Sequence, residues 1–229
     1  MAGLAALRVG AGLVTIATRP EHAERIGVTH PVLMAHGVTN ASDLDNVLSK
    51  ANVVVFGTGL KDERWSESLF DRLEQCSLPI VADAGALRLL ARKKGQRKTW
   101  ILTPHVGEAA ALLDTTSAQI QSDRFAAVQN LYSRYHSTSV LKGAGSLVAD
   151  GKRLTVCAEG NAGMSVAGMG DVLSGVLGGL LAQGMSYSDA TITGVCIHAK
   201  AGDLAASSNP RGLIAVDLLP YIRQCVNLK

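Results

Sequence analysis

A single charged residue, Asp171, stands in the stretch GNAGMSVAGMGDVLSGVLGGLLAQG, which runs from Gly160 to Gly184. The pattern predicts a helix that begins near Asp171, directly after two glycines. A helix start presents backbone N–H groups and a partial positive charge, and glycines let those groups turn toward an anion, so the site suits phosphate. An Asp beside a bound phosphate could take a proton from a hydroxyl that attacks the phosphorus. The other interpretation is a helix cap, which contributes about 1 kcal/mol without any chemistry.

Three glycines in the predicted helix also need an explanation. Gly175, Gly178 and Gly179 should each cost up to about 1 kcal/mol relative to alanine. They indicate close approach of another backbone or of a flat ligand. Close packing of the helix on a sheet explains them equally well.

A second candidate segment is VLKGAGSLV, Val140–Val148, which is typical of a strand, a glycine turn and another strand. Lys142 and the amides through Ser146 could hold a nucleotide phosphate or ribose. An ordinary hairpin turn explains the same residues.

A third candidate segment is LTPHVGEAAALL, Leu102–Leu113, in which a strand ends, turns at Pro104 and starts a helix. The carboxylate of Glu108 on this turn could orient Mg²⁺ or its water shell. A Glu in a first helical turn also stabilises the helix through its dipole. His105 is by default a histidine at the solvent edge.

The elements that must position these residues follow from the apolar pattern. Strands are predicted at Gly12–Thr18, Ala51–Gly57, Leu78–Ala84 and Thr99–His105, with helices over 42–51, 64–76 and 86–94. The first three strands are largely apolar and are expected to be buried on both faces, as in a parallel sheet of right-handed βαβ units. Ligands of such sheets bind beyond the carboxyl ends of the strands, so Gly57, Asp83 and His105 should share one rim.

The second half of the chain has a different pattern. Residues 137–160 contain β-rich runs joined by short glycine-bearing connections, which favours antiparallel hairpins, and residues 168–228 are mostly helical in pattern. The predicted fold class is α/β, a three-layer α/β/α sandwich with a mostly parallel sheet and an antiparallel edge. It is expected to form one domain over residues 1–229.

The composition argues against several partners. The net charge of +3 is small and evenly spread, so no nucleic acid is expected, and the basic run 92–98 is interpreted as a solvated loop. The uncharged stretch between Asp171 and Asp189 contains Ser, Gln, Tyr and glycines and is shorter than the about 20 apolar residues of a membrane span. Four cysteines without CxxC spacing favour reduced thiols in a cytoplasmic protein: Cys76, Cys157, Cys196 and Cys225.

Taken together and in this order, these segments resemble the ADP/ATP-dependent NAD(P)H-hydrate dehydratases of the ribokinase-like superfamily. The matching segments span nearly the whole chain: AALRVGAGLVTIAT, ANVVVFGTGL, VADAGAL, ILTPHVGEAAALL, VLKGAGSLV, GNAGMSVAGMGDVLSGVLGGLLAQG and RGLIAVDLLPYI. The resemblance implies a ribokinase-like fold and an enzyme that phosphorylates the ring hydroxyl of hydrated NADH or NADPH with ADP or ATP. Loss of phosphate then restores the reduced cofactor. Hydroxide is a poor leaving group and phosphate a good one, and phosphoryl transfer needs mainly positioning and charge neutralisation.

The same resemblance implies a role for each matching residue. Asp171 would be the base on the substrate hydroxyl, and Gly59 and His105 would contact the substrate with it. The nucleotide would be bound by Lys142, Gly143, Ala144, Gly145, Ser146 and Gly170. The anion hole would be formed by Gly168, Met169 and Gly170. Glu108, indirectly, and Asn161 would organise Mg²⁺ and phosphate. The implied partners are NAD(P)H hydrate and ADP or ATP, with Mg²⁺ as cofactor, in a homo-oligomer. An upstream epimerase domain is common in bacterial members.

The chain departs from the family pattern in several places. It has HVGE for HPGE, GTGLK for GPGLG, and DAGALR for DADALN, which removes a carboxylate at Gly85 and adds Arg88. The family also carries a strand and a Lys/Gly-bearing turn before AALRVGAG, near which this sequence begins. Either the sequence is a fragment, or its start was chosen late, or the protein has lost part of its substrate pocket. Two alternatives therefore stay open: a small-molecule kinase of the same superfamily and a nucleotide-binding protein without activity.

Overall fold

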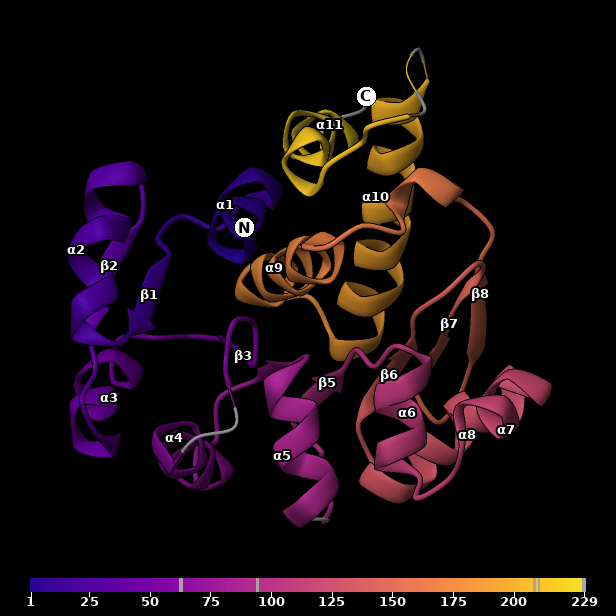
Figure 1. Ribbon diagram of the computed structural model, residues 1–229, viewed down its shortest axis with the longest axis horizontal. Helices are drawn as coiled ribbons and strands as arrows, with labels where there is room; N and C mark the ends of the chain where they lie inside the picture. The colour runs from indigo at the N-terminus through magenta and orange to yellow at the C-terminus, as the bar shows by residue number, and fades with distance from the viewer. Residues whose placement is uncertain (62–63, 94, 208, 210, 228–229) are drawn as a thin grey trace.

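The computed structural model describes residues 1–61, 64–93, 95–207, 209 and 211–227, which are shown in Figure 1. Within these residues the main sheet has six strands in the order β3-β4-β5-β6-β7-β8. Their bounds are Val54–Phe56, Ile80–Ala82, Trp100–Leu102, Thr138–Leu141, Ser146–Ala149 and Leu154–Cys157. Strands β3 to β6 are parallel, and β7 and β8 are added antiparallel. The predicted fold class, a mostly parallel sheet with an antiparallel edge, is confirmed.

Helices cover both faces of this sheet (Figure 1). One face packs against α1 (Ala2–Val9), α9 (Met169–Ala182), α10 (Tyr187–Ala206) and α11 (Leu218–Cys225). The other face packs against α3 (Ala41–Leu48), α4 (Arg64–Glu74), α5 (Gly85–Lys93), α6 (Val106–Leu112), α7 (Ser117–Ser122) and α8 (Arg124–Tyr135). Short 3₁₀ helices occur at Ala162–Met164 and Ala215–Asp217.

Along each central strand of the sheet, successive side chains point alternately to the two helical layers. In β4, Val81 belongs to the core under α9, whereas Ile80 and Ala82 belong to the core on the opposite side. In β5, Ile101 and Leu102 divide in the same way. Successive side chains of a strand point to opposite faces, so apolar residues at consecutive positions are what a sheet covered on both sides requires.

The first predicted strand behaves differently from the other three. β1 (Thr15–Thr18) pairs only with β2 (Met34–Gly37), in a separate two-stranded parallel sheet connected by α2 (Pro20–Thr29). The expectation that this strand is buried on both faces is wrong, because its residues are half-buried or exposed. The strand has threonine at both ends, and its Ala17 is exposed.

The glycines of α9 are explained by helix packing. A methyl group at Gly175 would lie 2.1 Å from the carbonyl oxygen of Ala2, and one at Gly179 would lie 2.3 Å from Cγ1 of Val9. Helix α1 therefore rests directly on the backbone of α9, and this contact fixes where α9 begins. The structure therefore supports close approach of another backbone at Gly175 and Gly179, and packing on the sheet at Gly178, where a methyl group would lie 2.4 Å from Cγ2 of Val55 in β3.

Among the helices of the described residues, none combines the length and the apolar character needed to cross a membrane.

Candidate active site

Four residues that follow neighbouring strands meet at one rim of the main sheet. Gly57, Asp83 and His105 come after or near the ends of the parallel strands β3, β4 and β5, and Lys142 comes directly after β6. The rim predicted for the first three residues is therefore present. Lys142 joins it because β6 is parallel to β5 and its backbone N–H donates to the carbonyl oxygen of Pro104, at 2.9 Å.

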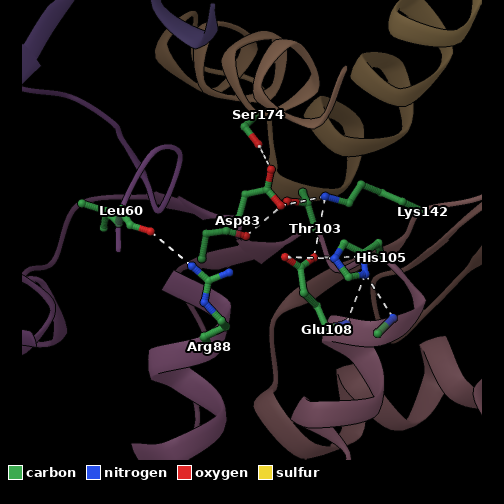
Figure 2. A network of polar contacts seen from close by, with 10 residues as sticks. Leu60, Asp83, Arg88, Thr103, His105, Glu108, Lys142 and Ser174 are labelled. Atoms are coloured by element: carbon green, nitrogen blue, oxygen red, sulfur yellow. Dashed lines mark hydrogen bonds and ion pairs between the residues drawn. The ribbon is translucent and has the colours of Figure 1, made fainter. Parts of the chain in front are cut away.

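Asp83 is the centre of a buried polar network at this rim (Figure 2). Its side chain is almost fully buried, and its two oxygens accept from Nζ of Lys142 at 2.7 Å and from Oγ of Ser174 at 3.0 Å. The pair thus joins strand β4, the turn after β6 and helix α9. A buried carboxylate with a charged partner and a second donor is held in one orientation.

Gly57 lets the chain pass over Asp83. Its φ is +117°, and a Cβ there would lie 1.7 Å from the carbonyl oxygen of Asp83. Only glycine tolerates this backbone conformation at this distance.

His105 and Glu108 cap helix α6 reciprocally. Nδ1 of His105 accepts from the N–H groups of Gly107 and Glu108, at 3.0 and 3.3 Å, and Oε2 of Glu108 accepts from the His105 N–H at 2.9 Å. Because Nδ1 is the acceptor, the proton of a neutral His105 lies on Nε2, and the ring is largely exposed. The Glu108 carboxylate is buried and lies 3.9 Å from Nζ of Lys142.

The first turn of α9 faces the same network. Gly168, with φ +89°, is the N-cap residue, and Asp171 is the third residue of the helix. The interpretation of Asp171 as a helix cap is therefore wrong. The first N–H groups of a helix have no intrahelical acceptor, so the predicted anion hole of Gly168, Met169 and Gly170 has free donors. A methyl group on Gly170 would lie 3.2 Å from both Nζ of Lys142 and Oδ2 of Asp83, so the helix start lies directly against the ion pair.

The carboxyl of Asp171 is electrostatically disfavoured in its charged form. Burial raises its pKa, and the negative charge of Asp83 raises it further, while the ammonium of Lys142 opposes the shift. A carboxylate with a raised pKa is a stronger base than an ordinary aspartate.

The KGAGS turn joins β6 and β7, which pair antiparallel as predicted. Its carbonyl oxygens are held from α8, because the guanidinium of Arg124 donates to Ala144 at 2.6 Å and to Gly145 at 3.0 Å. The hydroxyl of Ser146 donates to the carbonyl oxygen of Gly143 and so closes the turn. Arg124 was not among the predicted site residues, since nothing in its helical segment, 20 residues upstream, marks this contact.

Both polar atoms of the Asn161 side-chain amide form hydrogen bonds within the protein. Its Oδ1 accepts from the Gly163 N–H at 3.0 Å, and its Nδ2 donates to Asp203 of α10 at 2.9 Å. The residue caps the short helix Ala162–Met164 on the segment that leads to Gly168.

Two of the departures from the family pattern touch each other (Figure 2). The guanidinium of Arg88 donates to the carbonyl oxygen of Leu60, at 3.2 Å. A Cβ at Gly85 would lie 2.8 Å from the same oxygen, so the 57–60 turn covers the position where the family has a carboxylate. Gly59, with φ +75°, has open space beside its Cα, which leaves that side of the turn accessible.

His198 of α10 is a second residue that the sequence did not single out. Burial lowers the pKa of its imidazole to about 4, although a hydrogen bond with the Met169 backbone opposes this shift. A neutral histidine is therefore packed against the first residue of α9. His198 has no metal-ligand spacing to another histidine or to a cysteine, so the sequence gave no reason to predict it as a site residue.

The fold and the rim define a class of protein. A mostly parallel sheet between two helical layers, with a glycine-capped helix start opposite the strand ends, is the ribokinase-like architecture. Residues 1–224 match the family model described as NAD(P)H-hydrate dehydratase, and the chain belongs to that family.

Solved structures and relatives agree with this assignment. The ADP/ATP-dependent NAD(P)H-hydrate dehydratase from Bacillus subtilis, co-crystallised with ATP/Mg²⁺, is similar in fold, with a TM-score of 0.84 at 23% identity over 99% of this chain and 83% of that chain. The bifunctional NAD(P)H-hydrate repair enzyme Nnr of Coxiella burnetii is 48% identical over 229 residues, which are 99% of this chain and 47% of the relative. The ADP-dependent (S)-NAD(P)H-hydrate dehydratase of Neisseria meningitidis serogroup B is 40% identical over 183 residues, 75% of this chain and 62% of the relative. The chain spans about half the length of the bifunctional relatives that it matches.

Proposed function

We propose that this chain dehydrates NADH or NADPH hydrate with ADP or ATP as the phosphoryl donor. The observation that carries the proposal is the position of Asp171, a carboxyl with a raised pKa, in the first turn of the helix whose start lies directly against Lys142. A proton acceptor beside an anion-binding helix start is what transfer of a phosphoryl group to a hydroxyl requires.

The reaction has two steps. In the first step, Asp171 takes the proton of the ring hydroxyl, and the hydroxyl oxygen forms a bond to the terminal phosphorus of the nucleotide. The bond from that phosphorus to the rest of the nucleotide breaks, which leaves AMP from ADP or ADP from ATP. In the second, the carbon–oxygen bond breaks with its electron pair on the departing phosphate, and loss of a ring proton restores the reduced nicotinamide. The N–H groups at the start of α9 and the Lys142 ammonium stabilise the charge of the transferring group.

The nucleotide is expected along the KGAGS turn. Arg124 and Ser146 occupy carbonyl oxygens of this turn. The Lys142 N–H donates to Pro104, and within the described residues the N–H groups of Gly143, Ala144 and Gly145 are available to phosphate or ribose. Lys142 in the turn and Gly170 at the helix start lie close together, so both are expected to contact the same phosphate. On the other side of the rim, we expect the open turn at Gly59 and the exposed ring of His105, whose Nε2 lies 3.5 Å from Oε1 of Glu108, to contact the substrate.

The residues at the rim fit a magnesium ion that is bound mainly through the nucleotide. Mg²⁺ prefers oxygen ligands and keeps several waters, often with one or two carboxylates and substrate phosphates. Glu108 supplies such a carboxylate beside Lys142, and among the described residues no group of three acidic, histidine or cysteine ligands occurs at this rim. Glu108 would hold the ion through water, whereas the engaged amide of Asn161 would shape the phosphate loop. When bound, Mg²⁺ neutralises phosphate charge.

The decisive experiment is a product assay. The chain is incubated with NADH hydrate, Mg²⁺ and either ADP or ATP, and the return of NADH absorbance is followed together with phosphate release. Recovery of NADH with one phosphate per turnover supports the proposal. A stable phosphorylated product indicates the small-molecule kinase, and nucleotide binding without either product indicates an inactive relative.

The cytoplasmic location, the homo-oligomeric state and an upstream epimerase domain stay predictions. The bifunctional relatives are about twice as long as this chain, which supports the last of them. Size-exclusion chromatography with light scattering would determine the oligomeric state.

A further inference from the structure

Two cysteines and a glutamate meet at the edge of the sheet, away from the ion pair of the pocket. The Sγ atoms of Cys157 and Cys196 and a carboxylate oxygen of Glu159 all lie within 4.8 Å of one another. Cys157 is the last residue of β8, Glu159 follows two positions later, and Cys196 is in the middle of α10. Residues two apart in an extended chain point the same way, so Cys157 and Glu159 approach α10 together.

We propose that these three side chains bind one thiophilic divalent cation, with Zn²⁺ as the ion that their chemistry suits. Zn²⁺ is held by thiolates at about 2.3 Å and by carboxylates at about 2.0–2.2 Å, in tetrahedral sites. Two thiolates on one tetrahedral ion lie roughly 3.8 Å apart, so adjustments of about 1 Å in side-chain position close the site around the ion. A water molecule completes the four ligands on the exposed side of Glu159.

The charge balance of the site follows from its ligands. Binding of Zn²⁺ releases the two thiol protons and leaves two thiolates, one carboxylate and the ion, with a net charge of −1.

The site matters because of the segment that it would fix. Residues 157–161 run along α10: a Cβ at Gly160 would lie 3.7 Å from Cβ of Ala199, and the Gly160 N–H and the Asn161 amide both donate to Asp203. The ion would tie the start of this segment to α10, while Asp203 ties its end. The segment then leads to the start of α9.

The test uses Co²⁺ as a spectroscopic probe on the reduced full chain. Ligation by two thiolates gives a thiolate-to-cobalt charge-transfer band in the near ultraviolet and tetrahedral d–d bands in the visible, and Zn²⁺ should bleach both at one equivalent. Cys196→Ser should lose most of the charge-transfer band, and Glu159→Gln should keep the band but bind Zn²⁺ more weakly. The matched control is Cys76→Ser, which removes a thiol outside the cluster and should leave the spectrum unchanged.

A second readout protects the test against misfolded variants. In the wild-type chain, Zn²⁺ should slow amide hydrogen exchange in residues 157–161, and Cys196→Ser should lose this effect while the rest of its exchange pattern stays native. Absence of the charge-transfer band in the reduced wild-type chain, or its persistence in Cys196→Ser, overturns the proposal. So does a Cys157–Cys196 disulfide found without reductant, if the reduced chain binds no Co²⁺.

Discussion

Two regions at the rim of the main sheet, each with a carboxyl group, touch but are built differently. The ion-pair cluster consists of Asp83, Lys142 and Ser174, and both oxygens of its carboxylate are occupied by donors. The helix start, Gly168–Asp171, has free backbone N–H groups and a carboxyl whose pKa is raised by burial and by the charge of Asp83. One region is satisfied by its own partners, whereas the other is completed only by a ligand.

This difference distinguishes a carboxylate that holds the elements of the site in position from a carboxyl that can take part in the reaction. A carboxylate that accepts two hydrogen bonds is held in place, and taking up a proton would cost it those bonds. A carboxyl that is buried beside another negative charge gains from taking up a proton. The Asp83 carboxylate therefore holds strand, turn and helix together, and the helix start, with the Lys142 ammonium against it, is the region where a proton and a phosphate are exchanged.

The largest effect is expected for Asp171→Asn. Removal of a general base costs about 10²- to 10⁴-fold in rate, so kcat should fall about 10³-fold. Because the site disfavours the charge of Asp171, the amide should leave the thermal midpoint at pH 7 unchanged or slightly higher. ADP affinity, measured by calorimetry, should stay within about threefold. Comparable turnover in the variant would falsify the assignment of Asp171 as the base.

The pH dependence offers a second check on the same residue. Its folded pKa is raised, so the protonated form is favoured by folding, and the carboxylate becomes available only as pH rises through this raised value. The kcat/KM of the wild-type chain should therefore drop on the acid side at a pH above the ordinary aspartate pKa. The residual rate of Asp171→Asn should show no such drop.

The next largest effect is expected for Lys142→Met, which leaves Asp83 buried without its cation. Breaking a buried pair costs 3–5 kcal/mol, and the partial exposure of Lys142 places the loss of unfolding free energy near the lower end, at about 3 kcal/mol. Denaturant unfolding measures it. Adding Asp83→Asn to Lys142→Met should recover part of the loss. Lys93→Met, at an exposed pair with Asp71, is the control and should change stability by less than about 1 kcal/mol.

Much of this arrangement follows from local patterns in the sequence. The apolar runs predicted β3, β4 and β5, and parallel topology then placed Gly57, Asp83 and His105 at one rim. The glycines before Asp171 predicted a helix start, and KGAGS predicted the turn between antiparallel strands. These features depend on residues that are close in the chain.

The parts that could not be predicted depend on contacts between distant segments. Asp83 meets Lys142 across 59 positions and Ser174 across 91, and neither separation has a periodic signal. Arg124 reaches the KGAGS turn from a helix whose pattern shows only an apolar face. The pairing of β1 with β2 outside the main sheet was missed for the same reason, since a strand pattern does not identify the partner strand.

A smaller effect is expected for Gly175→Ala, which disturbs the packing that locates the helix start. The added methyl would lie 2.1 Å from the Ala2 carbonyl oxygen, and overpacking of this kind costs about 1–3 kcal/mol, which the better helix propensity of alanine offsets by about 1 kcal/mol. The net loss of stability should be up to about 2 kcal/mol, with a higher KM for ADP because the anion hole moves. Gly27→Ala, in α2 with open space around it, is the matched control and should stabilise the chain. Equal effects at both glycines would mean that α1 does not set the position of α9.

The smallest effect is expected for Ser174→Ala, which removes one donor from Asp83 and leaves Lys142 in place. Loss of one hydrogen bond to a buried acceptor costs about 1 kcal/mol or somewhat more, so the unfolding free energy should fall by about that amount. The exposed Ser133→Ala in α8 is the control and should be nearly neutral. Because Asp83 keeps its ion pair and takes no part in proton transfer, kcat should stay within about twofold. A loss of kcat comparable to that of Asp171→Asn would show that Asp83 takes part in the chemistry, and its assignment to positioning alone would then be wrong.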